Sequence, residues 1–208
     1  MLSHGAGGSL GAPWPLDLVV AREVLVAAGW AFVFVEQPWM VAGRRIAGRP
    51  ATLDAAWVPI VDALMRGRGK LPRPLVVGGR SAGARVACRT AATTGADAAL
   101  LLSFPLHPPG RPEKSRADEL ALAPDPTWVV QGARDPFGTP EEVGPRLPPG
   151  ATLLEVPGVH SFPVGSRAAL IAALESVTSG LEGMLLAGAP LHRAWSSHRR
   201  GHPQGPPD

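Results

Sequence analysis

Residues 74–92 read PLVVGGRSAGARVACRTAA, and they predict a strand, a sharp turn and a helix. The short apolar run 75–77 is typical of a buried strand, and the alanine-rich run 82–92 is typical of a helix. Between them, residues 79–83 match the pattern G-x-S-x-G around Ser81. In such a turn the serine backbone is strained, and bulky side chains two positions before or after it would clash.

This turn predicts a Ser81 hydroxyl that stands above the edge of a sheet and faces the positive N-terminal end of the next helix. Such an arrangement presents a serine as a nucleophile. The alternative is an ordinary strand, turn and helix with a chance serine, since the chain contains 25 glycines. The strand-like and helix-like flanks favour the nucleophile.

Strand-like and helix-like segments alternate along the chain, which is the pattern of a parallel sheet covered by helices on both faces. We therefore expect an α/β fold with a mostly parallel, doubly wound sheet of about six strands. The predicted strands are residues 30–36, 75–77, 98–104, 127–131 and 152–156. The predicted helices are residues 15–28, 52 or 54 to 66, 82–92, and a last one that Ser166 caps and that reaches residue 187.

Two connections are expected to lack regular structure for most of their length. Residues 38–50 form an arginine-bearing loop, and residues 105–126 form a proline-rich connection with one short helix near 117–122. The second connection is too short for a large lid, which favours an open cleft. Residues 1–188 are expected to form one domain, and residues 189–208 a disordered, basic, proline-rich tail.

The beginning of the chain departs from this pattern. Residues 4–8, HGAGG, form a loop of the kind that normally follows a full strand, but only Met1, Leu2 and Ser3 precede it. So short a strand would lie beside the strand that leads to Ser81, in the interior of the sheet. We therefore expect an N-terminally truncated form of the fold. Either the start codon lies upstream or the leading strand has been lost, and we favour the first explanation.

A serine hydroxyl needs a general base to remove its proton and a carboxylate to orient that base. Residues 127–135, TWVVQGARD, form a strand and a glycine turn that end at Asp135. Residues 152–160, TLLEVPGVH, form a strand and a proline–glycine turn that end at His160. Both residues follow the carboxyl end of a strand, where open α/β sheets place their ligands. The order Ser, Asp, His predicts a catalytic triad of the α/β-hydrolase type.

Each of these assignments has an alternative. Asp135 precedes Pro136, so it could be an ordinary turn aspartate. His160 could cap the last helix or bond a neighbouring backbone group. His4 and His107 compete as general bases only weakly, because they lie in the opening loop and in the proline-rich connection.

Hydrolysis of an acyl bond also needs donors for the oxyanion that develops on the substrate. We expect the backbone N–H groups of Ala82, directly after the serine, and of Ala6, in the glycine loop, to serve as these donors. The competing interpretation of the glycine loop is a phosphate cradle. Leu10 occupies the third glycine position of G-x-G-x-x-G and no P-loop lysine follows, so this interpretation fails.

Other site features are weaker. Arg80, beside the serine, and Arg134, beside the acid, could hold an anionic substrate group, although structural salt bridges are the more common role of arginine. His107 is a further weak substrate-binding candidate. No H-E-x-x-H or paired-cysteine spacing occurs, so we predict neither a metal nor a cofactor.

The composition of the 208 residues, with 45% hydrophobic and 18% charged residues, is that of an ordinary soluble globular protein. The single cysteine, Cys88, is expected to be a small core residue. No leader and no apolar run of membrane-spanning length stands out, so we expect a cytoplasmic protein with no membrane partner. The net charge of +3 comes from scattered arginines, which predicts no specific nucleic-acid partner. Nucleic-acid binding through the basic tail is the alternative.

In combination, five stretches resemble a small α/β-hydrolase-like family. It groups testis-expressed protein 30, the hydrolase-like domain of subunit 3 of the NSL histone-acetyltransferase complex, and bacterial dienelactone-hydrolase-like proteins. The stretches are HGAGG at residue 4, GGRSAGAR at 78, FPLHPPGRPE at 104, QGARDPFG at 131 and HSF at 160. The resemblance implies a serine-hydrolase site at Ser81, Asp135 and His160 but no substrate. True dienelactone hydrolases use cysteine as the nucleophile, whereas this chain has serine.

The function expected from the sequence is therefore that of a serine hydrolase. It would cleave an ester, thioester or related acyl bond of a small molecule through an acyl-enzyme, with water as the second nucleophile. The alternative is a catalytically silent, hydrolase-fold interaction module, as scaffolding relatives suggest. Nothing in the sequence predicts an oligomeric state.

Overall fold

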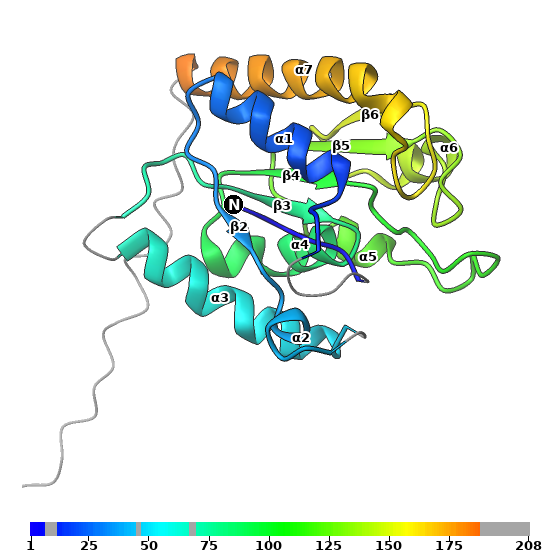
Figure 1. Ribbon diagram of the computed structural model, residues 1–208, viewed down its shortest axis with the longest axis horizontal. Helices are drawn as coiled ribbons and strands as arrows, with labels where there is room; N and C mark the ends of the chain where they lie inside the picture. Colours follow the sequence, from blue (N-terminus) through cyan, green and yellow to red (C-terminus); the bar gives the residue numbers. More distant parts are fainter. Residues whose placement is uncertain (7–11, 45–46, 67–69, 188–208) are drawn as a thin grey trace, which may run out of the picture.

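The computed structural model describes residues 1–6, 12–44, 47–66 and 70–187 (Figure 1). The predicted tail, 189–208, lies outside these residues. Six parallel strands form one sheet in the order β2-β1-β3-β4-β5-β6, which confirms the expected doubly wound sheet. The strands are β1 (Leu2–Ser3), β2 (Phe34–Val35), β3 (Val76–Arg80), β4 (Ala98–Leu102), β5 (Thr127–Gly132) and β6 (Thr152–Val156).

Helices cover both faces of the sheet (Figure 1). On one face, α1 (Leu16–Ala27) and α7 (Arg167–Leu186) pack against side chains such as Leu100 and Val130. On the other face, α3 (Pro50–Arg66) and α4 (Ala82–Thr94) pack against side chains such as Leu101 and Val129. The central strand β4 is buried along its whole length, as expected for a parallel strand covered on both faces.

The two-residue strand β1 lies in the interior of the sheet, as the sequence predicts, with Ser3 paired to Gly79 of β3 and Val35 of β2. Its close packing explains two glycines of the turn. A Cβ at Gly79, whose φ is +150°, would lie 2.3 Å from the Ser3 carbonyl oxygen, and a Cβ at Gly83 would lie 2.5 Å from it. The G-x-S-x-G spacing is thus required by contact with β1 and not only by the turn itself.

Several element boundaries differ from those predicted. The strand expected at 30–36 pairs only at Phe34–Val35, because its neighbour β1 offers two residues for pairing. The loop expected at 38–50 contains the helix α2 (Pro38–Val41), and α3 begins at Pro50, where proline is favoured in the first helical turn. The short helix α5 (Ala117–Leu120) was predicted, whereas α6 (Pro140–Val143) was not.

The cap predicted for the last helix is also different. Ser166 occupies the N-cap position of α7, but its side chain does not cap the helix. Its hydroxyl donates instead to the carbonyl of Pro157, in the turn after β6. The serine therefore ties the start of α7 to the segment that leads to His160.

One prediction about apolar segments was wrong. Residues Val164–Leu186 form a helical stretch of 23 residues with a mean hydropathy of 1.4, which is long and apolar enough to cross a membrane. Length and composition are weak evidence for a span, because core helices have the same properties. In α7 the side chains of Leu170, Leu174, Val177 and Leu181 are fully buried in the protein core. These contacts account for the buried side of the helix, which is 33% of the apolar window.

Candidate active site

Ser81 lies in the turn between β3 and α4, in the conformation predicted for the G-x-S-x-G motif. Its φ of 53° and ψ of −108° lie in a region that residues other than glycine rarely occupy. The Ser81 backbone N–H donates to the carbonyl of Leu102 in the neighbouring strand β4 at 3.0 Å. The surrounding sheet and helix hold this strained turn in place.

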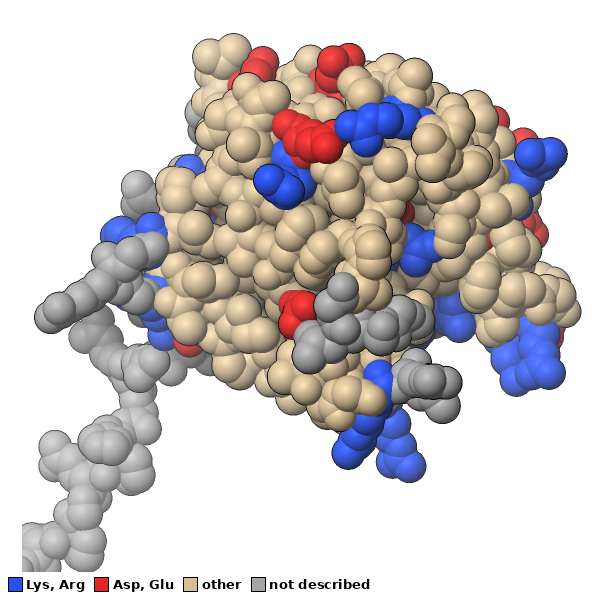
Figure 2. Space-filling view, viewed as in Figure 1, with Lys and Arg blue, Asp and Glu red and all other residues tan. Residues whose placement is uncertain are grey.

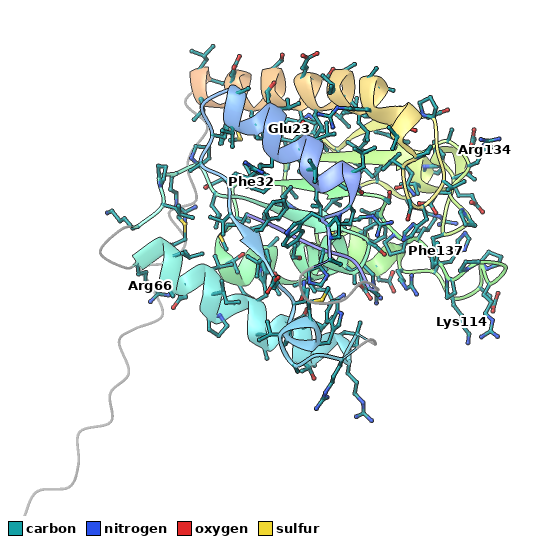
Figure 3. The ribbon with its side chains drawn as sticks, viewed as in Figure 1. Glu23, Phe32, Arg66, Lys114, Arg134 and Phe137 are labelled. Atoms are coloured by element: carbon teal, nitrogen blue, oxygen red, sulfur yellow. The ribbon has the colours of Figure 1, made fainter. Side chains whose placement is uncertain are left out.

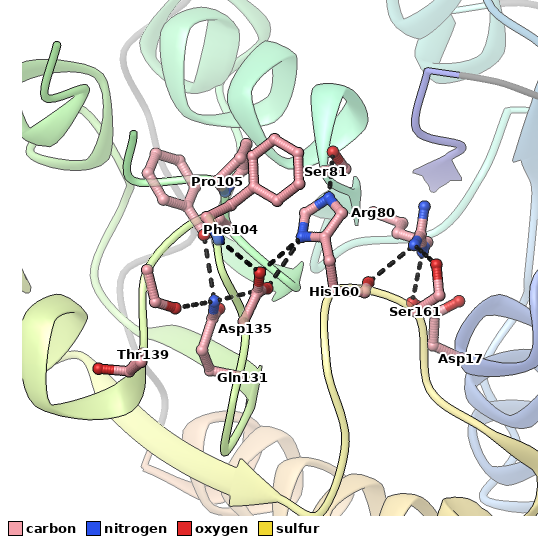
Figure 4. A network of polar contacts seen from close by, with 12 residues as sticks. Asp17, Arg80, Ser81, Phe104, Pro105, Gln131, Asp135, Thr139, His160 and Ser161 are labelled. Atoms are coloured by element: carbon pink, nitrogen blue, oxygen red, sulfur yellow. Dashed lines mark hydrogen bonds and ion pairs between the residues drawn. The ribbon is translucent and has the colours of Figure 1, made fainter. Parts of the chain in front are cut away.

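The structure brings Ser81, His160 and Asp135 into one hydrogen-bonded chain (Figure 4). The Ser81 hydroxyl lies 2.9 Å from His160 Nε2, and His160 Nδ1 lies 2.9 Å from Asp135 Oδ2. Because an ionised carboxylate can only accept a hydrogen bond, Nδ1 carries the proton and donates it to Asp135. Nε2 is then free to accept from the Ser81 hydroxyl. Asp135 is completely buried, whereas the imidazole is partly exposed.

The orientation of Asp135 is fixed by two further donors. The side-chain amide of Gln131, on β5, donates to Oδ2 at 3.0 Å, and the backbone N–H of Phe137 donates to Oδ1 at 2.9 Å. The Phe137 ring also lies against the His160 ring, with 4.1 Å between their centroids. Asp135 is therefore both a turn aspartate and the partner of His160. Gln131 was not predicted as a site residue, although a glutamine in a buried strand four residues before the acid was a usable signal.

The two expected oxyanion donors belong to segments next to the serine. Ala82 is the first residue of α4, where backbone N–H groups have no acceptor within the helix. Ala6 belongs to the loop after β1, and its neighbour Gly5 touches the turn: a Cβ on Gly5 would lie 3.0 Å from the Ser81 Cβ. This close approach is possible only for glycine. Gly7, Gly8 and Leu10 of the same loop lie outside the described residues.

His4 holds this loop in place and takes no part in the chain of hydrogen bonds at Ser81. Its Nε2 accepts the backbone N–H of Gln37 at 2.9 Å, so Nδ1 carries the proton and donates to the Gly5 carbonyl at 2.8 Å. The ring packs edge-on against Trp14 and Trp39. Burial lowers the pKa of His4, against smaller opposing effects of the bond to Gly5 and of the Glu36 charge.

Arg80 connects three parts of the site (Figure 4). Its guanidinium Nη2 donates to the His160 carbonyl at 2.7 Å and to the Ser161 hydroxyl at 2.6 Å. Its Nε lies 3.1 Å from Asp17 Oδ2, at the start of α1. Both side chains are buried. Burial raises the pKa of Asp17, and the positive charge of Arg80 acts in the opposite direction.

The other candidates lie apart from this arrangement. The two ring nitrogens of His107 contact the Pro108 carbonyl and Glu142 of α6, at 3.0 and 3.3 Å. Arg134 is exposed at the edge of the molecule (Figure 3). Cys88 is buried in the core, as predicted, and burial raises the pKa of its thiol to about 12. Within the described part of the chain, no three His, Cys, Asp or Glu side chains are grouped so that they could hold a metal ion.

A cavity of about 360 Å³ adjoins the serine. Its walls are the loop residues 4–6, the segment 12–17 at the start of α1, Glu36, Met40, Arg80 and the pair Ser161–Phe162. Ser81 and His160 do not line the cavity, but the residues beside them, Arg80 and Ser161, do. On the face shown in Figure 2, uncharged side chains predominate and the basic ones lie in several separate groups.

The parallel sheet, the turn at Ser81 and the positions of Asp135 and His160 after β5 and β6 are those of an α/β-hydrolase-type architecture. A family model described as "Alpha/beta hydrolase domain" matches residues 1–164, and the chain belongs to this family. No curated protein matches the sequence significantly.

Solved structures show the same fold. A putative hydrolase of the α/β superfamily from Xanthomonas campestris is 21% identical with a TM-score of 0.57, and the match covers 86% of this chain and 96% of that one. An α/β serine hydrolase without a lid from the same organism is 17% identical with a TM-score of 0.63, and the match covers 86% of this chain and 81% of that one. Est1E from Butyrivibrio proteoclasticus, solved with ferulic acid bound, is 16% identical with a TM-score of 0.63, and the match covers 89% of this chain and 87% of that one.

Proposed function

We propose that the protein is a serine hydrolase that cleaves an ester, thioester or related acyl bond through an acyl-enzyme. The observation that carries the proposal is the hydrogen-bonded chain from Ser81 through His160 to the buried Asp135. The serine stands at a positive-φ turn directly before a helix, which leaves its hydroxyl and the helix N-terminus side by side. A structural serine would need neither the strained turn nor the oriented imidazole.

The reaction follows from this geometry. His160 Nε2 removes the hydroxyl proton while Ser81 Oγ attacks the acyl carbonyl, and Asp135 stabilises the imidazolium that forms. The carbonyl oxygen becomes an oxyanion that accepts from the N–H groups of Ala82 and Ala6. His160 then protonates the leaving group, and the acyl-enzyme remains. Water attacks the acyl-enzyme with His160 again as the base, which releases the acid and restores Ser81.

The hydrogen-bond donors around the oxyanion are expected to contribute a large part of the rate acceleration. Removing one donor from such a site typically costs about 3–4 kcal/mol of transition-state stabilisation. The donor at Ala82 is a backbone group, so no substitution of its side chain removes it. Its position depends on the turn at Ser81, which Gly79 and Gly83 allow to pack against β1.

The comparisons support this proposal at the level of the fold. One similar structure is described as a serine hydrolase without a lid, and α5 is a single short helix in the connection after β4. The grouping with testis-expressed protein 30 and the NSL subunit, which the sequence motifs suggest, is part of the proposal. A cytoplasmic location is also part of it, in keeping with the single cysteine, which is unpaired and buried.

The experiment combines a fluorophosphonate probe with short p-nitrophenyl esters. We expect the probe to label the wild type, and Ser81→Ala and His160→Ala to abolish labelling and lower kcat/KM by about 10⁴-fold or more. Ser176→Ala, an exposed serine on α7, is the matched control and should behave as the wild type. Labelling that survives in Ser81→Ala would refute the proposal. A folded wild type that neither reacts with the probe nor cleaves any ester would favour the silent interaction module.

A further inference from the structure

The cavity beside Ser81 has the size and position of a substrate subsite. Its volume of about 360 Å³ lies within the range of about 300–1,000 Å³ that is usual for small-molecule sites. Gly5 and Ala6 line it, so it opens where the proposed mechanism places the acyl oxygen. His160, which must reach the leaving group, does not line it. The part of a substrate that fills the cavity is therefore the acyl group.

One guanidinium nitrogen of Arg80 is available in this cavity. Nε faces Asp17, and Nη2 is bonded to the His160 carbonyl and the Ser161 hydroxyl. Among the described residues Nη1 has no hydrogen-bond partner, and Figure 4 shows it turned away from the other contacts of Arg80. A Cβ on Gly5 would lie 2.9 Å from Nη1, so the glycine keeps this nitrogen accessible. Nη1 can donate to an oxygen acceptor on a bound acyl group.

The charges around Arg80 disfavour an anionic acyl group. Asp17 compensates the guanidinium at 3.1 Å, and Glu36 places a second carboxylate on the cavity wall. His4 contributes no positive charge, because its Nε2 must stay unprotonated to accept from Gln37. A substrate carboxylate that entered the cavity would lose its hydration and lie near two negative charges, and the one cation there is already paired. An uncharged oxygen would not suffer this electrostatic and desolvation penalty.

Most of the other described lining residues are apolar. Trp14, Met40 and Phe162 line the cavity together with proline and leucine side chains from the start of α1. Burial of an apolar chain against such surfaces contributes about 25 cal/mol per Å² of area removed from water. Among the described lining residues, the cavity therefore combines many apolar side chains with Arg80 Nη1 as a donor apart from the oxyanion site, and with two carboxylates against one guanidinium.

We propose that this cavity selects uncharged, largely apolar acyl groups that carry one acceptor oxygen, with Arg80 Nη1 as the donor and Asp17 as the residue that rejects anions. The inference rests on the proposed hydrolase function and assigns its substrate class. It argues against the weaker alternative that Arg80 could hold an anionic group, because Asp17 compensates the charge of Arg80 within the protein.

The test uses three p-nitrophenyl esters with the same leaving group. The 5-oxohexanoate and the hemiglutarate have nearly the same shape but differ in charge, and the hexanoate lacks the acceptor oxygen. For the wild type we expect kcat/KM for the 5-oxohexanoate to exceed that for the hemiglutarate by about tenfold or more, and that for the hexanoate by a smaller factor. Equal values for the two isosteric esters would overturn the inference.

Variants separate the charge from the shape of the cavity. Asp17→Asn leaves Arg80 uncompensated, so the preference should move toward the hemiglutarate by about tenfold or more. Glu36→Gln, at an exposed position, should move it in the same direction by a smaller factor without disturbing the core. In the double variant Asp17→Asn/Arg80→Gln the advantage of the 5-oxohexanoate over the hexanoate should disappear. If Glu36→Gln and at least one of the two variants that contain Asp17→Asn kept the selectivity of the wild type, the roles assigned to Asp17 and Arg80 would be refuted.

Binding measured without turnover separates this inference from the proposed function. Calorimetry on Ser81→Ala with the three esters reports selectivity even if no ester is cleaved. Selective binding without hydrolysis by the wild type would support the cavity assignment and refute the hydrolase. Hydrolysis by the wild type with equal binding of the charged and uncharged esters would refute the cavity assignment and leave the hydrolase standing.

Discussion

At the residue scale, the positive-φ serine depends on the two glycines beside it. Gly79 and Gly83 both pack on the Ser3 carbonyl oxygen, at distances that leave no room for a Cβ. The strained turn is therefore held from the side of β1 as well as by β3 and α4. A single methyl group should be enough to disturb it.

Gly83→Ala tests this contact. We expect the added Cβ to displace β1 or α4, to lower the free energy of unfolding by about 1–3 kcal/mol, and to reduce fluorophosphonate labelling. Chemical denaturation and labelling rates measure the two effects. The matched control is Gly183→Ala on α7, where the Cβ would meet nothing within 4 Å and should stabilise the helix by up to about 1 kcal/mol. If Gly83→Ala were as stable and as reactive as the wild type, the contact would not matter.

Gln131 is expected to act by positioning Asp135. Gln131→Met keeps the size of the side chain but removes the donor to Asp135 Oδ2. We expect kcat to fall by about 10- to 100-fold with little change in KM, because the imidazole loses a fixed partner while the cavity is unchanged. Steady-state kinetics with one ester separate the two constants. An increase in KM at constant kcat would contradict a positioning role.

The sequence predicted the three residues of the hydrogen-bonded chain because each lies in a local pattern: a strand, a turn of glycine or proline, and the polar side chain. For Arg80 it favoured a structural salt bridge, which the pair with Asp17 confirms, but it did not identify the partners. The partners of Arg80 lie on α1 and in the loop after β6, and no local pattern relates residues so distant in sequence. The same reason explains why His4 was considered as a base when it holds the loop that carries Ala6.

At the scale of elements, charged side chains join three helices on the face opposite α1 and α7. Glu119 of α5 accepts from Arg85 and Arg89 of α4 at 2.6–2.8 Å, and Arg89 also bonds Asp54 of α3. Burial acts to raise the pKa of Glu119, but the bonds and charges of the two arginines outweigh it, so this pKa lies below its usual value of 4.5.

This network predicts a pH dependence of stability. Because the pKa of Glu119 is lower in the folded state, ionised Glu119 contributes to the free energy of unfolding above about pH 4.5. This contribution is lost as the pH falls through the pKa of Glu119 in the folded state. Glu119→Gln should lower the free energy of unfolding by about 2 kcal/mol at neutral pH and by progressively less in acid. Denaturant unfolding between neutral and acidic pH measures the difference. A constant difference at all pH values would contradict the assignment.

The bounds of the strands and short helices show why local sequence patterns were insufficient to predict every element. Residues 30–36 have the composition of a full strand, but a strand extends only as far as its neighbour offers pairing, and β1 offers two residues. The helices with strong apolar faces, α1, α3 and α4, were predicted close to their observed bounds. The one-turn helices α2 and α6 have too few residues for a periodic pattern.

At the scale of the whole molecule, α7 is the element whose role is most easily mistaken. Its length and composition satisfy the criteria for a membrane span, but one side of it packs against α1 and the sheet. Gly180 lets the helix approach Trp128 of β5, since a Cβ there would lie 2.5 Å from the indole ring. We therefore expect α7 to behave as a core helix.

Leu174→Ala tests this role. The side chain is completely buried, so its truncation should lower the free energy of unfolding by about 2–4 kcal/mol. Leu186→Ala, at an exposed position of the same helix, should change it by less than about 0.5 kcal/mol. Unfolding curves of the two variants in detergent-free buffer provide the comparison. Equal, small effects would show that α7 does not contribute to the core.

The position of β1 has a consequence for the order in which the site can form during synthesis. The loop that carries Gly5 and Ala6 is made before both neighbours of β1, which are residues 34–35 and 78–79. His160 follows long after both. Strand β1 can therefore pair on both sides only after residues 78–79 have been made, and a complete site exists only after His160 has followed. Acquisition of fluorophosphonate reactivity by stalled nascent chains of increasing length would report when this late assembly is complete.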